Sequence, residues 1–291
     1  MRNLISFYYI FLILFTVFSC QEKTVAPSQN ENLSRIVQPN GNIDIPAFLQ
    51  IAGVNLVSPK DFPGYESASE NNGGGCIPNR DSLKCTTHHV FQKLTDHYNP
   101  ALCDSNIFYC CDDTVYIRYT FKICQDLAGN FTLDYYDFSA TPGCDTVILY
   151  WHSLEQQNLY DSLDREIDRF EHEASLYLEN KITGDWIKLF GNKYSCPNTF
   201  VSSNFYSSTC FKRCVTFDPT KEPAFEEHKL FCGRGCCKRT RAFCLTDGIV
   251  NASEPSFEEV GGPCTGNVFL DCSIFSGGFL IGQCHRTCDI P

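Results

Sequence analysis

The sequence is poor in the signals that usually reveal an enzyme. It contains no G-x-S-x-G, no H-E-x-x-H, no P-loop, no G-x-G-x-x-G and no EF-hand loop. Methionine occurs only at position 1, and there are two tryptophans in 291 residues. The sequence therefore lacks the motifs that are typical of serine hydrolases, zinc proteases, nucleotide-binding proteins and calcium sensors. We therefore assign no catalytic residue, no metal ligand and no cofactor from the sequence.

The chain also lacks the cysteine spacing C-x2-C, although it has 19 cysteines. Structural zinc sites and thioredoxin-type redox sites both depend on that spacing. The spacing C-x3-C occurs instead, for example at Cys232 and Cys236. This pattern favours disulfides over a metal cage or a redox centre.

Positive charge is scarce, with 23 Lys and Arg against 34 Asp and Glu. The net charge of -11 argues against nucleic acid as a partner. Basic residues nevertheless gather in 211–241, where we expect a basic patch. Its partner is an acidic glycan, a lipid headgroup, an acidic protein or the chain's own acidic helix. The patch consists of Lys212, Arg213, Arg234, Lys238, Arg239 and Arg241.

One long apolar run is present, at the amino terminus. Arg2 precedes Leu4 to Phe18, and about 15 apolar residues are fewer than the roughly 20 of a membrane span but typical of a signal peptide. The run ends in Val17-Phe18-Ser19-Cys20, which resembles the lipobox of bacterial lipoprotein precursors. A smaller residue than Phe18 is usual there. The resemblance covers only these first residues.

The lipobox resemblance implies that residues 1–19 are removed and that Cys20 carries acyl chains. An ordinary secretory signal cut after Ser19 and an uncleaved anchor are the alternatives. Parity favours lipidation, because setting Cys20 aside leaves 18 cysteines, an even number. We expect a protein of the cell envelope, held on the membrane by lipid and facing the periplasm or the cell exterior. The alternative is a secreted protein.

Disulfides are the expected role of the remaining cysteines, since this location is oxidising. Seven of them precede residue 153 and eleven follow it, so at least one bridge must join the two halves. Adjacent cysteines on a strand point to opposite faces and are expected to bind different partners. The pairing itself cannot be read from spacing. The 18 candidates are Cys76, Cys85, Cys103, Cys110, Cys111, Cys124, Cys144, Cys196, Cys210, Cys214, Cys232, Cys236, Cys237, Cys244, Cys264, Cys272, Cys284 and Cys288.

Three segments show clear periodicity. Residues 114–123 alternate between apolar and polar side chains and predict a strand. Residues 146–151, TVILYW, predict a buried strand. Residues 153–182 predict an amphipathic helix that begins at a capping box of Ser153 with Gln156 and ends before Gly184. We expect its many acids to face solvent.

The cysteine pattern CC…C-x19-C occurs twice, once on each side of this helix. We interpret it as a divergent internal duplication. The predicted fold is α+β and disulfide-rich, with two Cys-rich, mainly-β modules around one amphipathic helix. The expected segments are a lipoprotein signal peptide (1–19), a flexible tether (20–45), β module 1 (46–152), the acidic helix (153–182) and β module 2 (183–291).

The leading functional hypothesis is a lipid-anchored envelope protein that binds or scaffolds a protein or glycan outside the cytosol. Exposed Tyr135, Tyr136 and Tyr206 would then stack on sugars. An anchored or secreted hydrolase of envelope polymer is an alternative, with His152, Asp134 and Asp137 as its candidate residues. A metal-sequestering lipoprotein is a third hypothesis.

Overall fold

The fold is described from a computed structural model. The expected signal peptide and Cys20, the expected lipidation site, lie outside the residues that it describes. Those residues are 29–39, 42–62, 76, 84–104, 106–264, 272–273, 275, 277–284 and 286–288.

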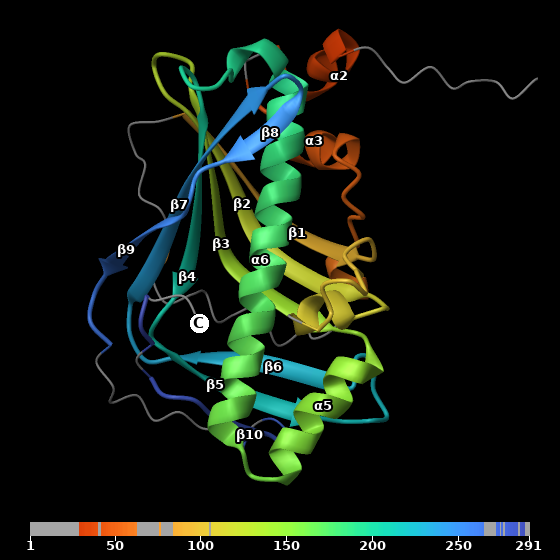
Figure 1. Cartoon of the computed structure of the whole chain (residues 1–291). Coiled ribbons are helices and arrows are strands. Elements are labelled where there is room, and N and C mark those ends of the chain that lie inside the picture. The colour runs from red at the N-terminus through yellow and green to blue at the C-terminus, as the bar shows by residue number, and fades with distance from the viewer. Residues whose placement is uncertain are drawn as a thin grey trace, which may run out of the picture.

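Seven strands form the larger sheet, which is antiparallel except where β3 and β4 run parallel. Its last strands share one long partner, because β8 pairs with one end of β7 and β9 with the other (Figure 1). The predicted strand 114–123 is confirmed as β2. In spatial order the strands are β1 (Lys84–Leu94), β2 (Val115–Gln125), β3 (Phe131–Pro142), β4 (Val201–Ser208), β7 (Gly235–Thr246) and β8 (Ile249–Ala252), with β9 (Ser256–Gly261) beside β7.

A second, smaller sheet has the order β10-β5-β6. A single long helix, α6 (Tyr160–Phe190), passes in front of both sheets (Figure 1). Its 31 residues extend about 46 Å. The predicted apolar stripe is confirmed at Leu163, Ile167, Phe170 and Ala174, which are all buried. The strands of the small sheet are β10 (Phe279–Ile281), β5 (Phe211–Phe217) and β6 (Phe225–Phe231).

The predicted strand 146–151 is wrong, because these residues belong to helix α5 (Asp145–Gln156). Its buried side chains are Val147, Ile148, Trp151 and Leu154, which recur at helical spacing. Trp151 packs edge-on against Phe170 and Phe225 in the core. A short apolar run does not distinguish a buried strand from a buried helix, and here tertiary packing selects the helix.

Both predicted ends of the long helix are also wrong. Ser153 and Gln156 lie in the last turns of α5, and α6 begins at Tyr160. Gly184 lies inside α6, which ends at Phe190 and is followed by Gly191 as its C-cap, with φ 47°. The helix continues because its buried face continues through Trp186, Ile187 and Leu189.

The described part of the expected tether is folded. Helix α2 (Gln29–Ile36) places Ile36 in the core, and α3 (Ile45–Ile51) places Phe48 edge-on against Trp186. The Asp44 side chain accepts a hydrogen bond from the Ala47 amide and caps α3. The packed core therefore includes residues that precede residue 46, where the folded part was expected to begin. Within the described residues, short 3-10 helices occur at η1 (Pro59–Asp61), η2 (Ile107–Cys110) and η3 (Gly191–Lys193).

The two expected modules share one sheet, because β3 precedes α6 and its parallel partner β4 follows it. The α+β, disulfide-rich class is confirmed. The disulfides do not follow the repeated cysteine pattern. Cys111 pairs with Cys144, whereas Cys237, at the corresponding place in the second half, pairs with Cys288.

Candidate functional site

Nine disulfides join all 18 cysteines that follow Cys20, as the sequence predicts. Cys76–Cys236 spans 160 residues and joins the two halves. Adjacent Cys236 and Cys237 in β7 bind different partners, as expected for neighbours on a strand. The other pairs are 85–124, 103–110, 111–144, 196–244, 210–264, 214–272 and 232–284.

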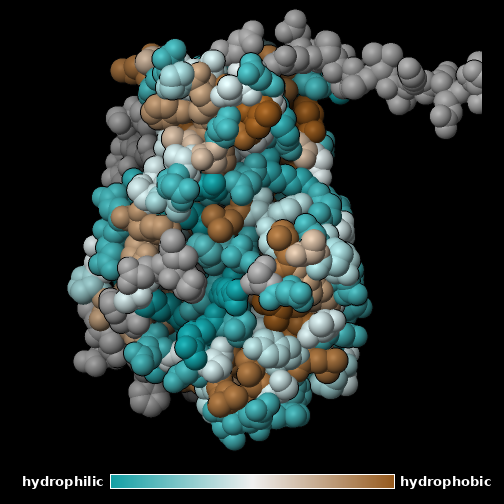
Figure 2. All heavy atoms as spheres, in the orientation of Figure 1, coloured by the Kyte–Doolittle hydropathy of each residue, from teal (hydrophilic) through white to brown (hydrophobic). Residues whose placement is uncertain are grey.

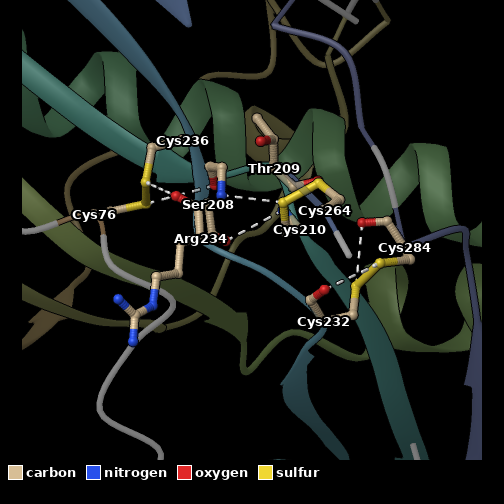
Figure 3. Close-up of a disulfide and its surroundings, with 10 residues drawn as sticks. Cys76, Ser208, Thr209, Cys210, Cys232, Arg234, Cys236, Cys264 and Cys284 are labelled. Carbon is tan, nitrogen blue, oxygen red and sulfur yellow. Dashed lines mark hydrogen bonds between the residues drawn. A yellow bond between two sulfur atoms is a disulfide. The ribbon is translucent and has the colours of Figure 1, made fainter. Parts of the chain in front are cut away.

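The disulfides Cys76–Cys236, Cys210–Cys264 and Cys232–Cys284 lie near one another around the segment CGRGCC (Figure 3). The two glycines of this segment make room for Cys210–Cys264. A Cβ on Gly235 would lie 2.7 Å from the Cys210 sulfur, and a Cβ on Gly233 would lie 2.7 Å from the Cys264 Cα. The Gly235 amide donates a hydrogen bond to the Cys210 sulfur at 3.1 Å. Packing beside Cys210–Cys264 thus requires the absence of a Cβ at Gly233 and Gly235.

The sulfur atoms of these cysteines are held in disulfides and offer no thiolate to a metal. In the part of the chain that the structure describes, no group of three His, Cys, Asp or Glu side chains could hold a metal ion.

Arg213 is the centre of a buried ion-pair network. Its side chain is 0% exposed and donates to Asp164 (2.7 Å), Asp168 (2.7 Å), Glu171 (2.9 Å) and Glu227 (2.6 Å). These carboxylates hold the pKa of Arg213 well above its usual value in spite of burial, which acts in the opposite direction. Arg286 also contacts Asp164 and Asp168, and Lys229 contacts Glu171.

A second buried pair lies further along α6. Arg239 donates to Glu179 at 3.0 Å and to Ser175 at 3.1 Å. Ser203 donates to the other oxygen of Glu179 at 2.6 Å, and Arg241 lies 3.5 Å from that carboxylate. Glu179 is therefore fully satisfied although it is 0% exposed.

The prediction that the acids of the helix face solvent is therefore wrong for three of them. Asp164, Glu171 and Glu179 are buried, because the sheets cover more of α6 than its apolar stripe suggests. The contact of the basic patch with the chain's own helix is confirmed for Arg213, Arg239 and Arg241.

The remaining basic residues do not form one surface with these three. Lys238 contacts Glu258 at 3.4 Å, Lys212 is half-buried in β5, and Arg234 is exposed. The Arg234 side chain points away from the disulfides (Figure 3). The basic segment is mainly structural.

A different cluster lies across β1, β2 and β3. His89 Nδ1 is 3.0 Å from the Thr120 hydroxyl, and that hydroxyl donates to Asp137 Oδ2 at 3.3 Å. We call these three residues the polar chain. His89 and Asp137 are exposed and Thr120 is buried between them.

The polar chain lies on the face of the sheet opposite α6. Tyr135 of β3 marks the helix face, because its hydroxyl bonds to Thr183 of α6 at 3.0 Å. Phe121 pairs with Tyr135 across the ladder and points the same way, so its neighbour Thr120 points outward. His89 stands opposite Thr120 in the antiparallel ladder.

The hydrogen bonds fix the tautomer of His89. Thr120 has a single hydroxyl proton, which goes to Asp137, since an ionised carboxylate only accepts. His89 Nδ1 must then carry a proton and donate it to the Thr120 oxygen. In neutral His89 the lone pair is on Nε2, which is left as an acceptor or base.

Asp137 sits on an irregular stretch of β3. The register shifts between Arg118 and Thr120, where β3 has one residue more than β2, and Asp137 has φ 54°. This bulge turns its side chain toward Thr120. Crowding by protein atoms raises the pKa of the exposed Asp137, against the opposing effects of Thr120, His89 and Arg118.

The hydrolase candidates are not brought together in the described residues. Asp134 is 0% exposed and accepts from Asn204 at 2.8 Å. His152 lies on α5, where it contacts Gln156 at 2.8 Å and packs on Phe217. Asp137 is the one candidate that joins a cluster, and its partners are residues that the sequence analysis did not select.

The three tyrosines expected on the surface are buried. Tyr135 is enclosed beneath α6, and Tyr136 and Tyr206 pack with Cys76 and Cys236. The prediction of an exposed tyrosine platform for sugars is wrong, because the Cys76–Cys236 disulfide covers this part of the sheet.

Thr120 carried one sequence signal, because the alternation of 114–123 places it on the polar face of that strand. No strand was predicted for the segment of His89, and only the register places the two residues opposite each other. Comparisons with protein-family models, with curated proteins and with solved structures find no match to this chain. None of the helices in the described ranges has the length and apolar character needed to cross a membrane.

Proposed function

We propose that this chain is a lipid-anchored protein of the cell envelope whose disulfide-rich domain binds a partner outside the cytosol. One observation carries the proposal. The nine disulfides use every cysteine of the sequence except Cys20. Cys20 is the residue that the lipobox resemblance selects for acylation.

The location follows from the same sulfur chemistry. Many disulfides indicate an oxidising compartment outside the cytosol, since cytosolic thiols are kept reduced. A lipidated Cys20 needs no disulfide partner, which agrees with the even number of the others. Stable anchoring then comes from more than one acyl chain, each contributing about 0.8 kcal/mol per buried methylene.

The experiment is labelling with an alkyne analogue of palmitate during expression of the full chain in a bacterial host. We expect the wild-type protein to take up label and sediment with membranes, and Cys20→Ser to do neither. The matched control replaces Cys103 and Cys110 together by serine. It removes two cysteines but keeps Cys20, so labelling should persist. Wild-type protein that is unlabelled and free in the medium would refute the anchor and support plain secretion.

A further inference from the structure

The polar chain belongs to a larger array on the outer face of the sheet. Arg118 is two residues from Thr120 on β2, so the two side chains share a face. Phe91 stands opposite Arg118 on β1, as His89 stands opposite Thr120. The bulged Asp137 of β3 completes the array. The Arg118 guanidinium lies within electrostatic reach of three carboxylates, those of Glu227, Asp137 and Glu171.

The array offers hydrogen-bond acceptors and donors side by side. His89 Nε2 accepts, and Asp137 has lone pairs beyond the one that receives the Thr120 proton. The Arg118 guanidinium only donates, and in the part of the chain that the structure describes no hydrogen bond to another residue engages it. A ligand for this array must donate to two groups and accept from a third within a small area.

The charges narrow the class of ligand. The Asp137 carboxylate, together with Glu227 and Glu171 near Arg118, repels phosphate and sulfate, and the Arg118 guanidinium repels simple cations. A zwitterion could match both charges, but His89 and Asp137 are exposed, and ion pairs in contact with solvent contribute about 0–1 kcal/mol. Hydroxyl groups meet the requirement best, because each of them donates and accepts. The half-buried Phe91 ring beside Arg118 packs edge-on against Phe62, so only its exposed part adds apolar surface to the array.

We propose that His89, Arg118 and Asp137 form a binding site for a saccharide, with Thr120 as the residue that positions His89. The proposal rests on the binding function proposed above and names its ligand class. The face of β1–β3 opposite α6 is then the glycan-contacting surface of the protein.

The test is an array of immobilised neutral and acidic oligosaccharides probed with the oxidised, fluorescently labelled full chain in detergent. Four forms are compared: wild type, His89→Ala, Asp137→Asn and His88→Ala. Asparagine tolerates a positive φ, so Asp137→Asn removes charge without straining the bulge. His88 is the matched control, because it is the adjacent histidine on the opposite face of β1.

We expect wild type and His88→Ala to bind the same saccharides, and His89→Ala and Asp137→Asn to bind them at least tenfold more weakly. Absence of saccharide binding by the wild type would overturn the proposal. So would equal binding by His89→Ala, or displacement of the bound saccharide by millimolar glycine, which points to a zwitterion site.

Saccharide binding on the array does not depend on lipid anchoring. Cys20→Ser should give the same array pattern as the wild type. If wild-type protein binds saccharides on the array but takes up no palmitate analogue, the saccharide site stands and the lipid anchor is refuted. If wild-type protein takes up the palmitate analogue but binds no saccharide, the anchor stands and the saccharide site is refuted. Nitrogen-15 NMR of His89 gives a second readout: neutral His89 should carry its proton on Nδ1 in the wild type, and Thr120→Val should lose that preference.

Discussion

Arg213 and Glu171 form an ion pair of 2.9 Å in which the guanidinium is fully buried. Arg213 lies on β5 and Glu171 on α6, so the pair joins the small sheet to the long helix. Three further carboxylates share the same guanidinium. Burial of this many charges is tolerated because each of them has at least one oppositely charged partner.

Removal of Arg213 should therefore destabilise the protein strongly. Arg213→Met leaves four carboxylates without their central cation, and we expect the free energy of unfolding to fall by about 3–5 kcal/mol. Denaturant titration followed by fluorescence measures the change. Arg234→Met is the matched control, because Arg234 is exposed, and it should change stability by less than about 0.5 kcal/mol. Similar losses in both variants would contradict the structural role assigned to Arg213.

The disulfides should differ in their contribution to stability. The loop closed by Cys76–Cys236 is 160 residues and that closed by Cys103–Cys110 is 7. Taken alone, chain-entropy reasoning gives about 5 kcal/mol for the first and about 2 kcal/mol for the second. Paired Cys→Ser variants compared by thermal unfolding should rank in that order. The reverse order would show that strain or residual structure outweighs loop entropy.

Two histidines should make the protein sensitive to acid. Burial lowers the pKa of His97 to about 4 and that of His172 to about 4. Both are neutral in the folded protein, while in the unfolded chain they take up protons below about pH 6.5. The free energy of unfolding should therefore fall as the pH drops from about 6.5 to 4, by about 3 kcal/mol for His97.

His97→Phe isolates this effect. Phenylalanine keeps the ring contact with Phe108 and does not titrate. The variant should lose stability less steeply between pH 6.5 and 4. Burial raises the pKa of Glu171, so protonation of Glu171 in acid favours the folded protein and opposes the effect of His97. Glu171 is present in both proteins, and its contribution cancels in the comparison. Parallel pH curves for variant and wild type would disprove the assignment.

Two glycines should respond oppositely to alanine. A Cβ on Gly184 would meet only Val250, at 3.9 Å, and alanine favours the helix interior, so Gly184→Ala should stabilise the protein by about 0.5–1 kcal/mol. Gly235→Ala should cost about 1–3 kcal/mol, because the new methyl group is forced against the Cys210 sulfur. Melting temperatures of the two variants test this, and a destabilised Gly184→Ala would be the unexpected result.

The sequence was sufficient where one local signal decided the structure. Alternation predicted β2, the helical stripe predicted α6, and cysteine parity predicted a bridge between the halves. It failed where tertiary packing decided. The run 146–151 is apolar enough for a strand or a helix, and only its contacts with Phe170 and Phe225 select α5.

The candidate site depended on information that no local pattern contains. Asp137 was selected from the sequence, but with His152 and Asp134 as its companions. Its actual partners come from two other strands, and the register of three strands and a bulge brings them together. Likewise the acids of α6 were recognised, but their burial depends on arginines from β5 and β7 that lie more than 40 residues further along the chain.

The order of the disulfides has a consequence for biogenesis. Cys103–Cys110 is the only one of the nine bridges that joins cysteines next to each other in the sequence order. A chain that oxidised as it emerged would pair Cys76 with Cys85 long before Cys236 arrived. Such a chain would reach the native pairing only through exchange of these early bridges, and its yield would then depend on the thiol isomerase capacity of the compartment that receives it.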